Sequence, residues 1–358
     1  MEHNLLNDSM GNASQGEAQS CVLGGRHDYI FLLIPITYSV IFVVGVIGNG
    51  LVVIVIYCYL KVITVANIFL LNLALADLIF IITLPVWAAY TAMGYHWPFG
   101  GFLCKMCSTF VLINMNASIF LVTCLSIDRY LAIVHPMRSR SKRTLIQARV
   151  VCTVVWLLAA VTSLPNTFLR DTVSYESWNK TICAFQYPER HKEQWIFGMA
   201  LLKILLGFLI PSFIILTCYF LILRSLMQAY HITRSKQTNN EAFKVILAVV
   251  IMFLFCWLPY QIITFFDVLF RLNVIQNCYF SEMIDSSIPF TICLAYSNSC
   301  LNPILYGFVG HNFREKLFLL LRCLPPGIKS HSSLTIKMSN LSSRTVESMS
   351  LTARNHLP

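Results

Sequence analysis

Seven long apolar runs, separated by short polar segments, make up most of the chain. About 20 consecutive apolar residues are enough for a helix to cross a bilayer. No charged residue lies between Lys105 and Asp128, so the third run alone is long enough to cross. The pattern predicts an all-α membrane protein, a bundle of seven transmembrane helices at residues 29–60, 65–92, 106–127, 150–169, 195–223, 245–266 and 283–307.

The third run carries more polar side chains than a helix surrounded by lipid tolerates, among them Asn114, Asn116 and Ser118. Polar groups in hydrocarbon need partners from neighbouring helices. This helix is therefore expected inside the bundle. Its two ends also differ, because Cys104 opens it and the charged tripeptide Asp128-Arg129-Tyr130 closes it.

The composition is 57% hydrophobic and 12% charged, with a mean hydropathy of +0.67, whereas soluble domains carry roughly 25% charge. The net charge of +10 is confined to short loops and the tail, so we interpret it as membrane-orienting and expect no nucleic-acid partner. Lys61, Arg138 and Arg224 lie on the side shared with the carboxyl terminus. The positive-inside rule makes that side cytoplasmic and predicts a multi-pass plasma-membrane protein with an extracellular amino terminus.

Residues 1–28 are polar and contain no apolar signal-peptide core, so they are expected to form an extracellular glycosylated segment. Glycosylation sequons begin at Asn7, Asn12 and Asn179. Four of the 13 cysteines lie on this oxidising side, namely Cys21, Cys104, Cys183 and Cys278. Four cysteines allow three pairings, and the spacing does not choose among them.

The carboxyl end divides into two parts. Residues 308–323 have apolar side chains at helical spacing with charges between them, which predicts an amphipathic juxtamembrane helix on the bilayer. Cys323 at its end is a candidate palmitoylation site. Residues 324–358 are rich in serine and threonine and are expected to form a disordered cytoplasmic tail suited to phosphorylation.

Asp77 is an acid near the middle of the second run, where a charge costs about 2.5 to 3.5 kcal/mol on insertion scales. It needs partners, and amides or hydroxyls at similar depth are available at Asn49, Asn114, Asn298, Ser299 and Asn302. Two interpretations stay open. The cluster either binds a sodium ion that influences switching or makes structural hydrogen bonds.

Charged residues also occur toward the extracellular ends of the fifth and sixth runs, at Lys203 and Asp267. A lysine at the end of a span can simply extend to the interface. A ligand-binding role is favoured because other charged and aromatic residues share these outer and middle segments. They are Arg170, Asp285, Tyr38, Trp87, Trp257, Tyr260 and Tyr296.

Five short motifs occur together in this order along the chain. They are Gly48-Asn49, Leu73-Ala74-Leu75-Ala76-Asp77, Asp128-Arg129-Tyr130, Cys-Trp-x-Pro at 256–259 and Asn-Pro-x-x-Tyr at 302–306. In combination they resemble the rhodopsin-like, or class A, G-protein-coupled receptors, and the resemblance covers residues 29–322. The stretches 29–31, 69–78, 90–93, 97–100 and 121–137 further resemble the angiotensin II receptors.

Both subtypes of that family contribute to the resemblance. The third span and residues 329–339 are more similar to type 1, whereas residues 168–171, 194–195 and 217–220 are more similar to type 2. Tyr260 and Asn116 depart from the type 1 pattern, which has histidine and tyrosine there. Subtype and antagonist profile therefore stay open.

The resemblance implies a peptide pocket and an octapeptide ligand with an arginine near its amino end and a free carboxylate on its terminal phenylalanine. Arg170 and Lys203 would bind the carboxylate, and Asp267 and Asp285 the arginine. The full implied ligand set is Tyr38, Trp87, Arg170, Lys203, Asp267, Asp285, Ile288, Ile292 and Tyr296. The family's disulfides would be Cys21–Cys278 and Cys104–Cys183.

The resemblance also implies a signalling route. Asp128, Arg129 and Tyr130 would couple to a heterotrimeric G protein of the Gq class, which acts through phospholipase C and calcium. Receptor kinases and arrestin would bind the tail. The implied switch residues are Asp77, Asn114, Trp257, Asn298, Asn302 and Tyr306. No cofactor is expected apart from an allosteric sodium ion at Asp77.

Transport and catalysis fit the sequence less well than a receptor function. A transporter or channel would favour related halves, but no convincing internal repeat is found, and Asp77 is the only charge in its layer. An intramembrane enzyme would need paired acids, a serine–histidine pair or metal ligands, so no enzyme is expected. The alternatives within the receptor class are a type 2-like receptor with weak G-protein coupling and a receptor for another short peptide, such as a kinin or chemokine-like ligand.

Overall fold

The computed structural model describes residues 29–60, 64–139, 144–176, 179–232, 241–272, 274, 275, 277–309 and 311–323. The predicted sites at Asn7, Asn12 and Cys21 and the tail at 324–358 lie outside these ranges. The chain divides into two compact units, Met1–Leu317 and Phe318–Pro358. The helix bundle belongs to the first unit, and the description below concerns that unit unless α12 is named.

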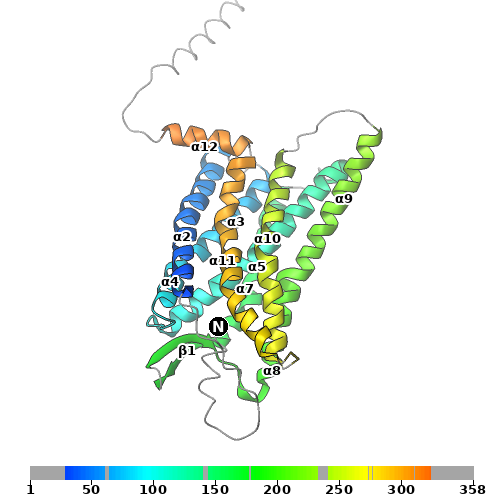
Figure 1. Ribbon diagram of the computed structural model, residues 1–358. Helices are drawn as coiled ribbons and strands as arrows, with labels where there is room; N and C mark the ends of the chain where they lie inside the picture. Colours follow the sequence, from blue (N-terminus) through cyan, green and yellow to red (C-terminus); the bar gives the residue numbers. More distant parts are fainter. Residues whose placement is uncertain are drawn as a thin grey trace, which may run out of the picture. The chain divides into compact units, whose positions relative to one another are not determined.

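Long helices run alongside one another to form the bundle (Figure 1). Several of them are built from consecutive segments, and π-helical turns occur within the first and fifth spans. In chain order the elements are α2 (Ile30–Ile54), η1 (Val55–Leu60), α3 (Val65–Ile81), α4 (Leu84–Ala92), α5 (Gly100–Val134), α6 (Pro136–Ser139), α7 (Leu145–Leu169), η3 (Glu189–His191), α8 (Lys192–Ile204), η4 (Leu205–Leu209), α9 (Ile210–Ile232), α10 (Glu241–Arg271), α11 (Cys278–Val309) and α12 (His311–Cys323).

Within the described residues, six helical segments are long and apolar enough to cross a membrane. They are Ile30–Leu60, Val65–Ala92, Gly100–Val134, Leu145–Leu169, Glu189–Gln228 and Ile246–Arg271. The seventh predicted span lies in the 32-residue helix α11, where polar residues such as Asn298 and Asn302 lower the hydropathy. All seven predicted runs are helical, and the all-α bundle is confirmed.

The observed helices extend beyond the predicted apolar runs. The third run was predicted at 106–127, but α5 spans Gly100–Val134 and includes Lys105 and Asp128. Hydropathy reports only the part of a helix that is apolar. The helical turns before and after the apolar run contain polar residues, so a search for apolar runs does not detect them.

A β-hairpin between α7 and η3 is an addition to the predicted all-α fold. Strand β1 (Arg170–Tyr175) pairs antiparallel with β2 (Lys180–Phe185), and Arg170 lies opposite Phe185. The Cys104–Cys183 disulfide joins β2 to the first turns of α5. The hairpin therefore holds Arg170 close to the end of α5 that carries Cys104.

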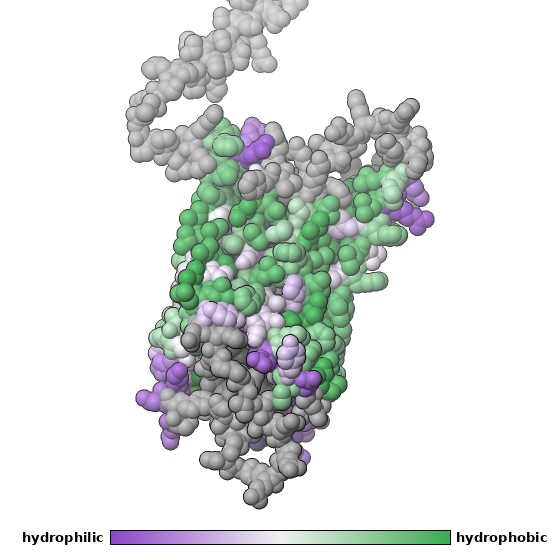
Figure 2. Space-filling view, in the orientation of Figure 1, coloured by the Kyte–Doolittle hydropathy of each residue, from purple (hydrophilic) through white to green (hydrophobic). Residues whose placement is uncertain are grey.

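The helix α5 lies inside the bundle, as its polar content predicted, and packs against α3, α7 and α9. Leu121 and Leu125 are completely buried within it. The outer surface of the bundle is also apolar, although it is exposed. Exposed apolar residues such as Leu32, Leu157 and Phe213 cover the sides of the helices, and Figure 2 shows this hydrophobic surface over the bundle. Such a surface is suited to lipid rather than water.

Candidate functional site

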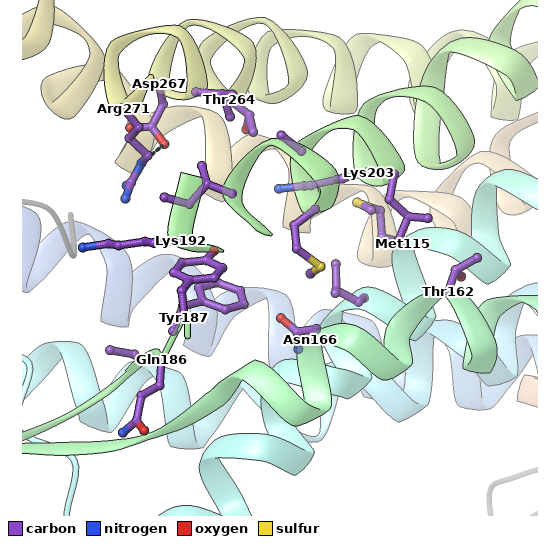
Figure 3. Close-up of a pocket in the computed structure, with 18 of the residues that line it drawn as sticks. Met115, Thr162, Asn166, Gln186, Tyr187, Lys192, Lys203, Thr264, Asp267 and Arg271 are labelled. Carbon is purple, nitrogen blue, oxygen red and sulfur yellow. Dashed lines mark hydrogen bonds and ion pairs between the residues drawn. The ribbon is translucent and has the colours of Figure 1, made fainter. Parts of the chain in front are cut away.

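A cavity of about 620 Å³ opens among α5, α7, the β-hairpin, α8 and α10. Figure 3 shows its labelled side chains arranged around a common space. Lys203, Asp267 and Arg271 supply charge to its walls, and Met115 and Asn166 line it from α5 and α7. Its size is that of a ligand pocket with a mixed polar and apolar lining.

The two predicted carboxylate-binding cations each contact a hydroxyl group and an aromatic ring. Lys203 Nζ donates to the Tyr260 hydroxyl over 2.7 Å and lies 4.4 Å from the centroid of the same ring. Among the described residues, no carboxylate lies within ion-pair distance of Lys203. Arg170 Nε donates to Ser108 Oγ over 3.1 Å, and the guanidinium lies 4.5 Å from the Phe185 ring centroid.

Asp267, predicted to receive the ligand's arginine, already has a cationic partner. Arg271 Nε donates to Asp267 Oδ2 over 2.8 Å, one helical turn away on α10 (Figure 3). A ligand arginine at this carboxylate would share it with Arg271 or take the place of Arg271. Asp285, the second predicted acid, is half-buried on α11 and is not part of this cavity's lining.

Several of the remaining predicted ligand residues form an aromatic cluster near α2 and α11. Tyr38 and Tyr296 lie with ring centroids 5.4 Å apart, and Trp87 contacts Trp97 at 5.3 Å. Ile292 packs against the same buried cluster, while Ile288 is half-buried on α11. Tyr296 and Tyr260 pack against the same buried hydrophobic cluster, and Tyr260 contacts Lys203, so the aromatic cluster and the Lys203 region are neighbours.

Part of the cavity wall was not predicted from the sequence. Thr162 and Asn166 of α7 line it, as do Tyr187 and Lys192 after the hairpin. The polar pair four residues apart in an apolar helix was a usable signal, because residues at that spacing share one face. Tyr187 and Lys192 had no such signal, since the path of the loop brings them to the cavity.

Asp77 is completely buried and hydrogen-bonded across helices. Asn114 Nδ2 donates to its Oδ1 over 3.0 Å, and Asn302 Nδ2 donates to its Oδ2 over 3.1 Å. Ser299 Oγ donates to Asn114 Oδ1 over 3.5 Å, and Asn49 Nδ2 donates to the Ser299 carbonyl over 2.8 Å. Helices α5 and α11 therefore contact the Asp77 carboxylate of α3 directly, and α2 joins this hydrogen-bond network through Ser299.

This cluster also fits a small cation by the chemistry of its atoms. The Asn298 Oδ1 and Asn302 Oδ1 atoms are buried, and neither has a hydrogen-bond partner among the described residues. Carboxylate and amide oxygens are the ligands that hard cations prefer. The residues present are consistent with the predicted sodium site.

Other predicted switch residues lie farther along α10 and α11. Trp257 is 3% exposed and lies between Phe253 and Tyr260, with ring centroids 6.0 and 6.1 Å away. The buried Tyr306 hydroxyl has no hydrogen-bond partner in the described part of the chain. Its ring contacts Phe313 at 6.1 Å. Both side chains are thus packed mainly through their rings, and neither polar group is tied to one partner.

The predicted G-protein-coupling tripeptide ends the buried part of α5. Arg129 Nη2 and Asp128 Oδ2 form an ion pair at 3.0 Å, in which Asp128 is 5% exposed. The Tyr130 hydroxyl lies 3.1 Å from His135 Nε2. Adjacent residues thus form an internal ion pair at one end of the helix whose other end carries Cys104.

The structure describes some, but not all, of the residues predicted to carry covalent modifications. The structure has the Cys104–Cys183 disulfide that the resemblance implies. Cys278 is also disulfide-bonded, but Cys21 lies outside the described residues. Asn179 is exposed in the hairpin turn with φ of 46°, a conformation asparagine tolerates. Cys323 ends α12, and palmitoylation there stays a prediction.

Comparison with known proteins adds sequence relationships to this geometry. A model of the family "7 transmembrane receptor (rhodopsin family)" matches residues 48–306. The chain is 51% identical to the type-1 angiotensin II receptor of Sus scrofa over 99% of this chain and 98% of that protein. It is 52% identical to the type-1 angiotensin II receptor A of Rattus norvegicus over 98% and 97%, and 54% identical to the Meleagris gallopavo type-1 receptor over 92% of each.

These relatives are receptors and not enzymes, and the same holds for this multi-pass plasma-membrane protein. The seven-helix bundle, the motifs within it and the near full-length similarity all agree. The chain belongs to the rhodopsin family of seven-transmembrane, G-protein-coupled receptors and, within it, to the angiotensin receptors.

Proposed function

We propose that this receptor binds angiotensin II and signals through a Gq-class G protein, phospholipase C and calcium. The observation that carries the ligand proposal is Lys203, a cavity cation with no carboxylate partner among the described residues. Arg170 begins the first strand of the hairpin, and its guanidinium lies 4.5 Å from the ring centroid of Phe185, which lines the cavity. The names of the relatives agree with this choice of hormone.

In the proposed complex the terminal carboxylate of the peptide binds Arg170 in a two-pronged pair, and Lys203 adds a point charge. The ligand competes with the Tyr260 hydroxyl for Lys203 and with Arg271 for Asp267. Both exchanges replace an internal contact with a contact to the ligand.

Displacement of labelled angiotensin II from membranes of cells expressing the receptor tests the ligand. Arg170→Ala and Lys203→Ala should each weaken the free-acid peptide by at least tenfold, since hydrogen bonds to charged groups contribute about 1.5–3 kcal/mol. The carboxyl-amidated peptide should lose much less. Equal losses for both peptides would remove the carboxylate assignment while leaving hormone binding intact.

Signalling follows from a bundle with two states. An agonist that binds the active state more tightly shifts the population, and a G protein that prefers that state raises agonist affinity in return. We propose that the amino terminus is extracellular and the carboxyl terminus cytoplasmic, where receptor kinases and arrestin bind the tail. Calcium imaging on addition of hormone tests the Gq assignment, and a hormone-binding receptor without a calcium response contradicts it.

We also propose that the Asp77 cluster holds a sodium ion that favours the inactive state. The support is the buried carboxylate together with the unpartnered Asn298 and Asn302 oxygens. Replacing choline chloride by sodium chloride should lower agonist affinity several-fold in the wild type, and Asp77→Asn should abolish that difference. A sodium effect that persists in Asp77→Asn would place the ion elsewhere.

A further inference from the structure

The α7 wall of the cavity is polar, although α7 is otherwise an apolar membrane helix. Thr162 and Asn166 lie one turn apart and both line the cavity, so they share a face of the helix. Asn116 of α5 donates from Nδ2 to Thr162 Oγ1 over 2.9 Å, and Thr162 Oγ1 donates to the Leu158 carbonyl over 2.8 Å. The hydrogen bond between Asn116 and Thr162 therefore joins α5 to α7.

Asn166 is the exception on this wall. Its side chain belongs to a residue only 3% exposed, yet its Nδ2 donor has no hydrogen-bond partner among the described residues. Asn166 lines the cavity, and Figure 3 shows its side chain at the edge of the space that the labelled residues surround. A buried amide without a partner costs free energy in the empty receptor, and native proteins rarely retain one without a reason.

The charges around the cavity are distributed unequally among the elements. All of its lining residues from α5 and α7 are uncharged, namely Leu112, Met115, Asn116, Thr162 and Asn166. The charged lining residues come from η3, α8 and α10, and are Glu189, Lys192, Lys203, Asp267 and Arg271. The chemistry of the α5–α7 side therefore matches a neutral group, while ionic groups of a ligand are better matched on the other sides.

From these contacts we infer that Asn166 forms a hydrogen-bonding subsite for an uncharged oxygen of the peptide ligand, a carbonyl or hydroxyl that accepts from Nδ2. The inference rests on the proposed peptide-binding function and adds a specificity-determining contact to it. The Asn116–Thr162 hydrogen bond positions the wall, and the Asn166 carbonyl, which accepts from the Arg170 backbone N–H, anchors the last turn of α7 beside the hairpin. The side-chain amide remains available to the ligand.

The test replaces Asn166 with leucine, which has a similar shape and no polar group. Two quantities are measured on the full-length receptor, namely the affinity for angiotensin II and the thermal stability without ligand. Asn166→Leu should weaken angiotensin II by about tenfold, the effect of losing one buried hydrogen bond. Ligand-free thermal stability should stay the same or rise, because an unpartnered donor has been removed.

Ser163→Ala is the matched control on the same helix. Ser163 is completely buried, but its hydroxyl donates to the Ala159 carbonyl over 2.7 Å, and it does not line the cavity. This variant should leave angiotensin II affinity unchanged. Peptide analogues that each lack one carbonyl or hydroxyl identify the partner group, because one analogue should lose affinity in the wild type and not in Asn166→Leu.

Three results would overturn the subsite. The first is unchanged affinity in Asn166→Leu, and the second is a loss of ligand-free stability together with affinity, which would assign Asn166 a structural role. The third is that every peptide analogue loses the same amount of affinity in Asn166→Leu as in the wild type, so that the effects of analogue and substitution are additive. Failure of the proposed function would give a different result, because the wild-type receptor itself would then not bind angiotensin II. That result would rule out the peptide subsite as well.

Discussion

Two charged side chains of the cavity, Lys203 and Asp267, contact groups of the receptor that a ligand could replace. Lys203 binds a neutral hydroxyl, and Asp267 binds an arginine on its own helix. Asp171 lies on β1, outside the membrane-spanning segments. Its Oδ2 lies 2.8 Å from Lys105 Nζ, and the Thr172 N–H donates to its Oδ1 over 2.8 Å. These contacts connect the start of α5 to β1 near the Cys104–Cys183 disulfide.

The Lys105 contact gives a pH dependence whose sign can be worked out. The hydrogen bonds from Lys105 and the Thr172 backbone lower the pKa of Asp171 below its usual range. A carboxyl whose folded pKa is depressed stabilises the fold above its unfolded pKa of about 3.9 and loses that contribution as the pH falls. Asp171→Asn should therefore lower thermal stability slightly at neutral pH, by less than about 1 kcal/mol because the pair is exposed.

The difference between wild type and Asp171→Asn should shrink as the pH falls below about 4. Thermal unfolding of the purified receptor across this pH range measures it. Glu176→Gln is the control, because Glu176 is an exposed acid near the same hairpin for which no ion pair is found among the described residues. A constant difference at every pH would mean that the effect of Asp171 is steric rather than ionic.

At the scale of elements, α2 and α11 approach closely where the Asp77 cluster forms. A Cβ atom added to Gly48 of α2 would lie 2.9 Å from Pro303 Cβ on α11. The proline ring is rigid and cannot move aside as a flexible side chain would. Glycine at this position therefore allows the two helices to pack at the distance that also brings Asn49 to the Ser299 carbonyl.

Gly48→Ala should destabilise the receptor by about 1–3 kcal/mol, the usual cost of overpacking a tight interface. Gly50→Ala on the same helix is the matched control, since nothing lies within 4 Å of its added Cβ. That variant should be neutral or stabilise the helix by up to about 1 kcal/mol. Thermal unfolding of both variants in one detergent compares them, and equal effects would contradict the close approach to Pro303.

At the scale of the molecule, the same helices carry residues of the cavity and residues of the opposite end. Helix α5 carries Asn116 in the cavity wall and Asp128 in the ion pair with Arg129. Helix α10 carries Asp267 and, farther inside, the buried Trp257. A change in helix packing at the ligand therefore has rigid elements through which it can reach the other end.

Asp128→Asn should raise basal calcium or inositol phosphate signalling several-fold, because it removes the charge that holds Arg129 at 3.0 Å. Reciprocity requires agonist affinity to rise as well if the active state becomes more populated. Tyr130→Phe is a neighbouring control that removes the hydroxyl facing His135 and keeps the ion pair. Unchanged basal signalling in Asp128→Asn, at matched surface expression, would rule out the ion pair as a restraint on activation.

Much of the fold could be read from the chain because hydropathy is a local property. Each predicted run is helical, and the polar content of the third run predicted that α5 lies inside the bundle. The hairpin was missed because the pairing of Arg170 with Phe185 depends on the turn and the disulfide, not on apolar runs. Lys203 was identified as a candidate because a charge near a span end is conspicuous.

The sequence by itself determined that seven apolar helices form, and that a buried Asp77 must find amide or hydroxyl partners. Only the tertiary structure decided that Asn114 and Asn302 contact Asp77. It also decided that Asn166 lines the cavity with an Nδ2 donor that has no hydrogen-bond partner in the described part of the chain. The physical reason is that a helix's hydrogen bonds and hydropathy are set along its own residues. Its rotation about its axis is set by packing against every neighbouring helix, and that rotation decides which side chains meet.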